Sequence, residues 1–317
     1  MSANATAAVR VANRVAAVPD AERPHRVRLY ALYILAVTTN LAIFFYGFDY
    51  YKLSSIDRPF SPKHHMLRPS GPVGLYLGFM GVALFVGIFL YPLRKHWAWL
   101  GTKGSTRHWL DIHVLMGLTA PFIIAFHSTL KFKGIAGMAF WIMFAVSASG
   151  VVGRYLYAQI PRKVTTAELS MRELQELQEQ LSQQLAAQRL LPEADLRALL
   201  RMPDAGFVKK LPIVVALVYM MILDVVRVFR VARLRRHALG FGDSLQTLFG
   251  FLPTRHAELE QAIHAAAEEA ALSKRVLFLS RSQKVFHLWH VVHKPFSYAF
   301  AVLAILHIVL QFALGYF

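Results

Sequence analysis

Four histidines in two apolar segments have a spacing that suits chemistry across a membrane. His113 and His127 lie fourteen residues apart, and so do His293 and His307, with mostly apolar residues inside each pair. In an α-helix, fourteen residues return to within about 40° of the same face and rise about 21 Å. One such helix would present an imidazole near each side of a hydrocarbon layer about 30 Å thick. Two helices of this kind, facing each other, would form two sites with an imidazole from each helix.

Paired imidazoles in dry, helical surroundings are the ligands that b-type haem needs, one on each face of the iron porphyrin. We therefore expect two non-covalent, bis-histidine haem b groups held by these four residues. A polar group inside a span is costly and by default functional, which applies most directly to His127 and His307. A proton path or a transition-metal site is the alternative. The chain contains no cysteine, which excludes covalent c-type haem and cysteine-ligated iron–sulfur clusters.

Two further residues are predicted to help bind the cofactor. Gly117 lies four residues after His113 and would let a macrocycle lie against the backbone. Arg154 lies near the inner boundary of its span, where it is a candidate partner for haem propionates, although contact with lipid headgroups is an alternative for this arginine. If His293 lies too shallow in the membrane, His290 is the substitute ligand.

The composition predicts an all-α, polytopic membrane helix bundle. Of the 317 residues 56% are hydrophobic and only 17% are charged, and the apolar residues come in blocks. About five spans are expected, with these ranges: residues 29–50, residues 73–91, a third span containing His113 and His127, residues 135–157 and residues 295–317. The net charge of +17 is assigned to loops that set orientation and meet anionic lipid, not to nucleic-acid binding.

The domain organisation follows from these blocks. Residues 1–28 form a basic N-terminal tail, residues 29–157 the first four spans, residues 158–284 a cytoplasmic helical insert, and residues 285–317 the last span. Within the insert, residues 166–191 and 256–275 have the leucine and alanine spacing of amphipathic helices. The insert would be a docking surface or a structural addition.

Residues 211–226 are the ambiguous part of the insert. About sixteen residues are short for a span, Asp224 interrupts them and an arginine cluster follows. We expect an interfacial helix near residues 211–230. In that case His113 pairs with His293, and His127 with His307; if the segment crosses the membrane, the partners are exchanged.

Charge in the loops favours a cytoplasmic N-terminus. The predicted inner segments 1–28 and 93–108 carry nine Lys and Arg residues, and the outer segments 49–70 and 131–134 carry six.

Three stretches together resemble a known group of membrane proteins. They are His113 to His127, the sequence Ser149-Gly-Val-Val-Gly-Arg154-Tyr-Leu-Tyr, and the sequence Trp289-His-Val-Val-His293-Lys-Pro-Phe followed by His307. They resemble bacterial ferric-reductase-like or cytochrome-b-like membrane domains, a group that includes the haem domain of NADPH oxidases. The resemblance covers residues 109–157 and 287–317 but not 158–284. It implies two parallel helices that each give two histidines to two stacked b haems.

The expected function is electron conduction across a bacterial inner membrane. The chain would be a subunit of a redox complex, passing electrons between a quinone or soluble donor and a separate partner, such as a c-type cytochrome or an iron–sulfur or flavin subunit. No dinucleotide fingerprint occurs, so reduction by NAD(P)H within this polypeptide is not expected. Asp57, Arg58, His64 and His65 form the outer polar cluster to test for quinone. The alternatives are a histidine-based proton channel or transporter, and a membrane-anchored scaffold.

Overall fold

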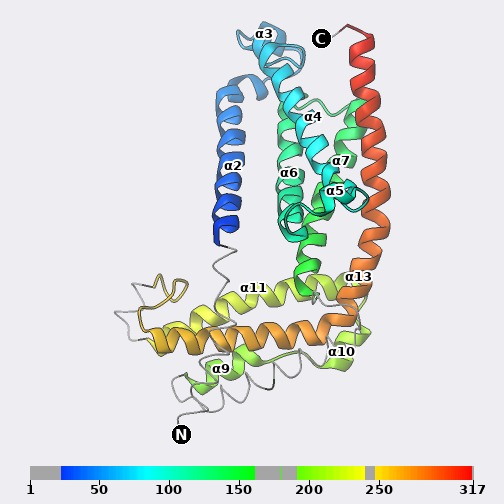
Figure 1. Cartoon of the computed structure of the whole chain (residues 1–317). Coiled ribbons are helices and arrows are strands. Elements are labelled where there is room, and N and C mark those ends of the chain that lie inside the picture. The colour runs from blue at the N-terminus through cyan, green and yellow to red at the C-terminus, as the bar shows by residue number, and fades with distance from the viewer. Residues whose placement is uncertain (1–22, 161–178, 180–190, 240–246, 316–317) are drawn as a thin grey trace. The chain divides into compact units, whose positions relative to one another are not determined.

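The computed structural model describes residues 23–160, 179, 191–239 and 247–315, and every regular element in these ranges is helical (Figure 1). The chain divides into two compact units. The membrane unit contains Pro19–Arg154 and Trp289–Phe317, and the insert unit contains Tyr155–Leu288. Helices α7 and α13 have residues in both units.

The elements of the membrane unit are α2 (Arg23–Tyr51), η2 (Arg58–Phe60), α3 (His64–Leu67), α4 (Pro72–Leu93), α5 (Ala98–Gly101), α6 (Thr106–His127) and α7 (Gly134–Gln159). Those of the insert unit are α9 (Glu193–Leu200), α10 (Ala205–Lys210) and α11 (Ile213–Ala238), followed by α13 (Ala257–Ala313). In the described residues, five helical stretches are long and apolar enough to cross a membrane, namely α2, α3 with α4, α6, α7 and α13. The prediction of an all-α polytopic bundle with about five spans is confirmed.

Helix α13 differs from the expected boundaries. The amphipathic segment 256–275 and the last span belong to one helix of 57 residues, with Pro295 inside it. The predicted helix at residues 166–191 lies outside the described residues, apart from 179 and 191, and so do residues 1–22 of the N-terminal tail.

Helices α4 and α6 approach closely through glycines of α4. A Cβ added at Gly81 would overlap the side chain of Ile124, and one added at Gly87 would lie 2.6 Å from the sulfur of Met116. Small residues at such positions let helices pack tightly in lipid, where no hydrophobic effect draws them together. The close contact fixes α4 against the helix that carries His113 and His127.

Arg58 joins the ends of two membrane helices. Its side chain is buried and donates to the carbonyls of Leu53 (3.1 Å), Tyr51 (3.0 Å) and Thr129. These carbonyls lie just at or after the C-terminal ends of α2 and α6, where helix carbonyls lack intrahelical partners. Arg58 therefore has a structural role at this end of the bundle.

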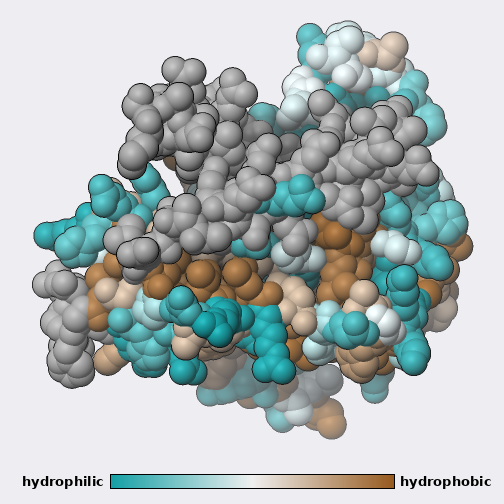
Figure 2. Space-filling model, turned by 90° about the horizontal axis from the view of Figure 1, so that it is seen from below, coloured by the Kyte–Doolittle hydropathy of each residue, from teal (hydrophilic) through white to brown (hydrophobic). Residues whose placement is uncertain are grey.

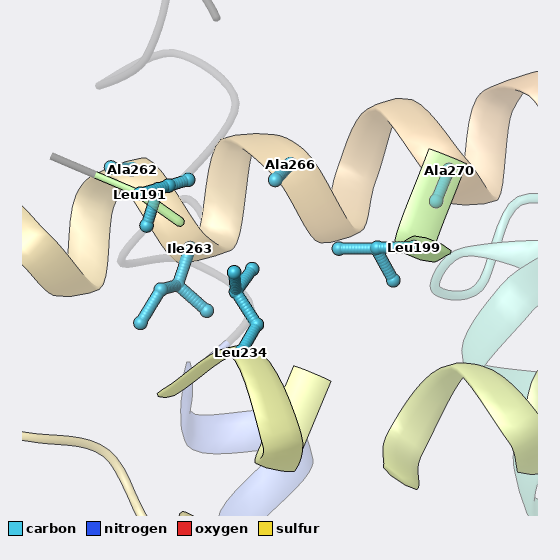
Figure 3. Close-up of a cluster of buried hydrophobic side chains, with 7 residues drawn as sticks. All are labelled: Leu191, Leu199, Leu234, Ala262, Ile263, Ala266 and Ala270. Carbon is cyan, nitrogen blue, oxygen red and sulfur yellow. The ribbon is translucent and has the colours of Figure 1, made fainter. Parts of the chain in front are cut away.

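The insert unit has its own hydrophobic core, which Figure 3 shows. Ala262, Ile263, Ala266 and Ala270 recur at helical spacing along α13 and face side chains from the rest of the unit. Those partners are Leu191, Leu199 of α9 and Leu234 of α11. The alanines leave room for the larger leucines, so the three helices pack as one body.

A buried ion pair stabilises the insert unit next to this core. Asp224 accepts hydrogen bonds from Tyr155 (2.6 Å) and from Lys274, whose side chain is 4% exposed, and Arg227 lies 3.2 Å away. Burial raises the pKa of Asp224, but the hydrogen bonds from Lys274 and Tyr155 and the neighbouring cations outweigh it and hold the pKa below its ordinary value of 3.8. The charge that interrupts residues 211–226 is thus paired inside the unit.

Large apolar side chains are exposed along the five candidate spans, for example Phe45 at 69%, Tyr76 at 74% and Phe312 at 63%. Such exposure is expected of lipid-facing surface. In the view from below, hydrophobic residues also reach the surface among hydrophilic ones (Figure 2).

Candidate functional site

The four spaced histidines meet in pairs inside the membrane unit. Helix α6 carries His113 and His127, and the C-terminal part of α13 carries His293 and His307. The ring of His113 lies close enough to that of His293 to interact electrostatically, and the ring of His127 interacts in the same way with that of His307. The two helices therefore run parallel, with one imidazole from each at two levels. The sequence left two pairings open, and the structure has the parallel one.

Helix α4 holds both histidines of α6 by its backbone. The Nδ1 atom of His113 lies 3.0 Å from the carbonyl oxygen of Ile88, and Nδ1 of His127 lies 2.8 Å from that of Gly74. Gly74 and Ile88 are also fourteen residues apart, so the spacing on α4 matches that on α6. Because a carbonyl only accepts, Nδ1 of each ring must carry the proton. Each Nε2 then keeps its lone pair, which is the form that binds a metal ion.

Pro92 explains why the Ile88 carbonyl is available. In a helix this oxygen would accept from the backbone N–H four residues later, and proline at position 92 has none. A carbonyl freed in this way needs another donor when it lies within a membrane. Nδ1–H of His113 is that donor, so one proline both leaves the acceptor open and orients the ring.

Gly78 makes room for the ring of His127. A Cβ at this position would lie 2.9 Å from Cε1 of His127, closer than real side chains approach. Without it, the ring can lie against α4 and reach the Gly74 carbonyl. The absence of a side chain at Gly78 therefore allows the ring of His127 to take this position.

Ser149 of α7 sets the tautomer of His293. Its hydroxyl lies 2.8 Å from the carbonyl of Val146 and 2.7 Å from Nδ1 of His293. The hydroxyl has a single proton, and the carbonyl can only accept it, so Ser149 accepts from Nδ1–H of His293. This network again leaves Nε2 of the histidine unprotonated.

Trp289 supports the same region. Its indole N–H donates to the Ser149 carbonyl (2.8 Å), and the centre of its ring lies 4.6 Å from that of the His293 ring. The indole occupies this position only because residue 153 is glycine, since a Cβ there would overlap it. His290, the substitute ligand in the sequence-based prediction, stacks edge-on against Trp289. It is the ring of His293 that lies 2.7 Å from the Ser149 hydroxyl and within electrostatic range of His113.

His307 is placed differently from the other three. It is half-buried and interacts with His127, but no hydrogen bond from the described residues reaches its ring.

Gly117 borders open space on α6. Apart from the adjoining backbone of α6, a Cβ added there would meet no atom of the described chain within 4 Å, although the residue is half-buried. Its carbonyl, which lacks a helical donor because of Pro121, accepts from the hydroxyl of Ser147 (2.8 Å). A flat group can therefore approach the α6 backbone at this point.

Arg154 has a protein partner that the sequence did not indicate. It donates to Oδ1 of Asp111 (2.8 Å), and Nε2 of His25 lies 3.2 Å from Oδ2. Asp111 is only 6% exposed, and the ring of His25 stacks on that of His108 at 3.5 Å. The sequence signal that could have indicated this partner is that Asp111 is an isolated acid in an otherwise apolar segment. One nitrogen of Arg154 is used here, and its other donors can meet a second anion.

The number of ligand atoms at each histidine pair limits which metal could bind. Among the described residues, no three His, Cys, Asp or Glu side chains gather to form a metal site. Each histidine pair offers two nitrogens, fewer than the four protein ligands of a structural zinc site. Two imidazole nitrogens would suit an iron whose other ligands come from a porphyrin.

On its fold, the chain is a multi-pass helical membrane protein. It matches no family model, no curated protein and no solved structure.

Proposed function

We propose that the chain is a membrane-embedded, di-haem b-type cytochrome subunit that conducts electrons across the membrane. The proposal rests on how the histidine rings are oriented and protonated. His113, His127 and His293 each use Nδ1–H in a hydrogen bond to a fixed acceptor and keep Nε2 for another bond. Histidines that bind metals are oriented in this way by their surroundings.

The residues fit the group in three respects. The pairs provide one imidazole from each of two parallel helices, Gly117 leaves a flat approach to α6, and Arg154 retains donors for a propionate. When bound, the haems supply one-electron redox chemistry. The chain would hold the two ligand pairs about 21 Å apart along the helices, and it fixes the imidazole protons of His113, His127 and His293 on Nδ1.

The proposed setting is a bacterial inner membrane with a cytoplasmic N-terminus. Electrons would pass between a quinone or soluble donor and a separate partner, either a c-type cytochrome or an iron–sulfur or flavin subunit. Two histidine ligands leave no open position for oxygen or substrate, so the chain acts as an electron-transfer subunit and not as a complete enzyme.

The haem content of the purified protein tests the proposal. A pyridine haemochrome assay on the detergent-solubilised chain is expected to give two haem b per polypeptide, with reduced-minus-oxidised bands of b type. His65→Ala, which changes an exposed histidine of α3, is the matched control and should keep both haems. A colourless protein with a normal helical circular dichroism spectrum would eliminate the proposal and favour a channel or a scaffold.

A further inference from the structure

Helix α11 has a second apolar face besides the one that packs in the insert unit. Ala216, Met220 and Leu234 are buried. The apolar stripe, between 39% and 70% exposed, consists of Val214, Val215, Val218, Met221, Ile222, Val225, Val228 and Phe229. At 100° and 1.5 Å per residue, this stripe is about 140° wide and about 22 Å long. A helix that is apolar on both faces needs a second apolar environment.

A neighbouring loop extends this surface. In residues 247–252 the exposed side chains are Leu248, Phe249, Phe251 and Leu252, each between 47% and 59% exposed. The ring of Phe251 meets that of Phe229 edge to face at 5.8 Å, so the loop continues the apolar stripe.

The loop is held in place so that it displays these side chains. Arg235 of α11 donates to the Gly250 carbonyl and forms a two-point ion pair with Glu260 (3.1 and 2.6 Å). Leu248 and Phe249 have φ values of 45° and 56°, a left-handed backbone that bulky residues rarely adopt. Strain of this kind persists where the surrounding structure enforces it, often at binding surfaces.

The charge around the surface is positive. Helix α11 carries five arginines and one acid, Asp224, which is paired inside the unit. Three of the arginines also form ion pairs, Arg227 with Asp224, Arg233 with Asp195 and Arg235 with Glu260. Arg236 is exposed two turns beyond the stripe and on the same side of the helix. A hollow of about 210 Å³ lies between α11 and the loop. It is lined by Arg227, Val228, Val231, Arg235, Gly250 and Phe251. An exposed guanidinium beside apolar side chains, as Arg236 provides, matches the phosphate and upper acyl chain of a lipid.

We propose that the apolar stripe and the 247–252 loop insert into the headgroup layer of an anionic leaflet of the membrane that the chain spans. The insert unit is joined through α7 and α13 to membrane spans, which keeps this surface at a high local lipid concentration. An apolar helix face bordered by arginines binds such a surface through both apolar burial and charge. This lipid contact does not require haem.

The chain has no cysteine, so single-cysteine variants can be labelled with a fluorophore at one site. Val218→Cys tests the stripe, Phe249→Cys tests the loop, and Arg197→Cys on α9, where the arginine side chain is 80% exposed, is the control. In nanodiscs, spin-labelled lipid should quench the first two labels several-fold more than the control, and aqueous iodide should do the reverse. Quenching by iodide at the level of the control would overturn the proposal. Protection from both quenchers would also overturn it, because it would show contact with protein.

The lipid charge is tested with the same labels. Replacing anionic by zwitterionic lipid should lower lipid quenching at position 218, and Arg236→Gln should lower it in anionic nanodiscs. Arg255→Gln, at an exposed position before α13, is the control and should leave the quenching unchanged. Equal quenching in both lipids, and in both arginine variants, would show that the leaflet is not selected by its charge.

Discussion

At the residue scale, the protonation of three histidine rings is decided by single acceptors. Ile88 and Gly74 provide backbone carbonyls, whereas Ser149 provides a hydroxyl whose own proton is used elsewhere. A hydroxyl can be removed by substitution, while a carbonyl cannot. A substitution at Ser149 therefore measures directly how much the hydrogen bond to His293 contributes to haem binding.

Ser149→Ala is expected to weaken haem binding at the His113–His293 pair by about 10–100-fold, because His293 loses the acceptor that orients its ring. The dissociation constant can be measured by haem titration of the apoprotein, followed by absorbance. Thr38→Ala, which removes an exposed hydroxyl of α2 that donates to the carbonyl of Ile34 in the same helix, should leave the affinity of this pair unchanged. Equal affinities for wild type and Ser149→Ala would assign the serine a packing role only.

At the element scale, the parallel course of α6 and the end of α13 determines which histidines share a haem. His127→Ala and His307→Ala are each expected to remove the same haem, and His113→Ala and His293→Ala the other, because a single imidazole binds far more weakly than a pair. Electron paramagnetic resonance of the oxidised protein distinguishes the two centres by their low-spin signals. A signal lost in common by His127→Ala and His293→Ala would contradict the parallel arrangement.

Helix α4 acts as the support for α6, and its glycine at position 78 is the sensitive point. Gly78→Ala is expected to displace the ring of His127, because the added Cβ would lie 2.9 Å from Cε1. One haem should be lost or bound more weakly, as measured by haemochrome stoichiometry. Gly101→Ala on α5 meets its nearest neighbour at 3.6 Å and should retain two haems. Full occupancy in Gly78→Ala would mean that α4 yields to the new methyl group.

At the scale of the whole molecule, the insert unit depends on a buried charge pair outside its apolar core. Asp224→Asn leaves Lys274 buried without a counter-charge, a change that costs roughly 3–5 kcal/mol for a fully buried pair. Asp224 is about a fifth exposed, so we expect a value at the lower end. Thermal unfolding of the insert unit, followed by hydrogen exchange, should shift to lower temperature. An unchanged midpoint would show that Lys274 finds another partner.

The same pair gives a pH dependence with a defined sign. The pKa of Asp224 is lower in the folded than in the unfolded chain, so its ionised form stabilises the fold above the unfolded-state pKa. The stability difference between wild type and Asp224→Asn should be constant above about pH 5 and shrink as the pH falls below about 4. Unfolding midpoints of both proteins across this range provide the measurement. A difference that grows on acidification would contradict the sign of the shift.

The sequence by itself determined the number and type of the membrane elements. Runs of about twenty apolar residues, such as those around Val73 and Ile135, can satisfy their backbone in lipid only as helices, so length and composition were sufficient. It also indicated His113, His127, His293 and His307 as one set, because a fourteen-residue interval is a property of a single helix.

Only the tertiary structure decided how those helices meet. The pairing of His113 with His293 depends on the relative direction of α6 and α13, which no local pattern encodes. The acceptors at Ile88 and Ser149 come from other helices, so their spacing to the histidines in the chain carries no signal. Asp111 with Arg154 was missed for the same reason, since an ion pair between helices forms by packing and not by periodicity. Spacing within one helix is set by covalent geometry, whereas contact between helices is set by side chains that are distant in the sequence.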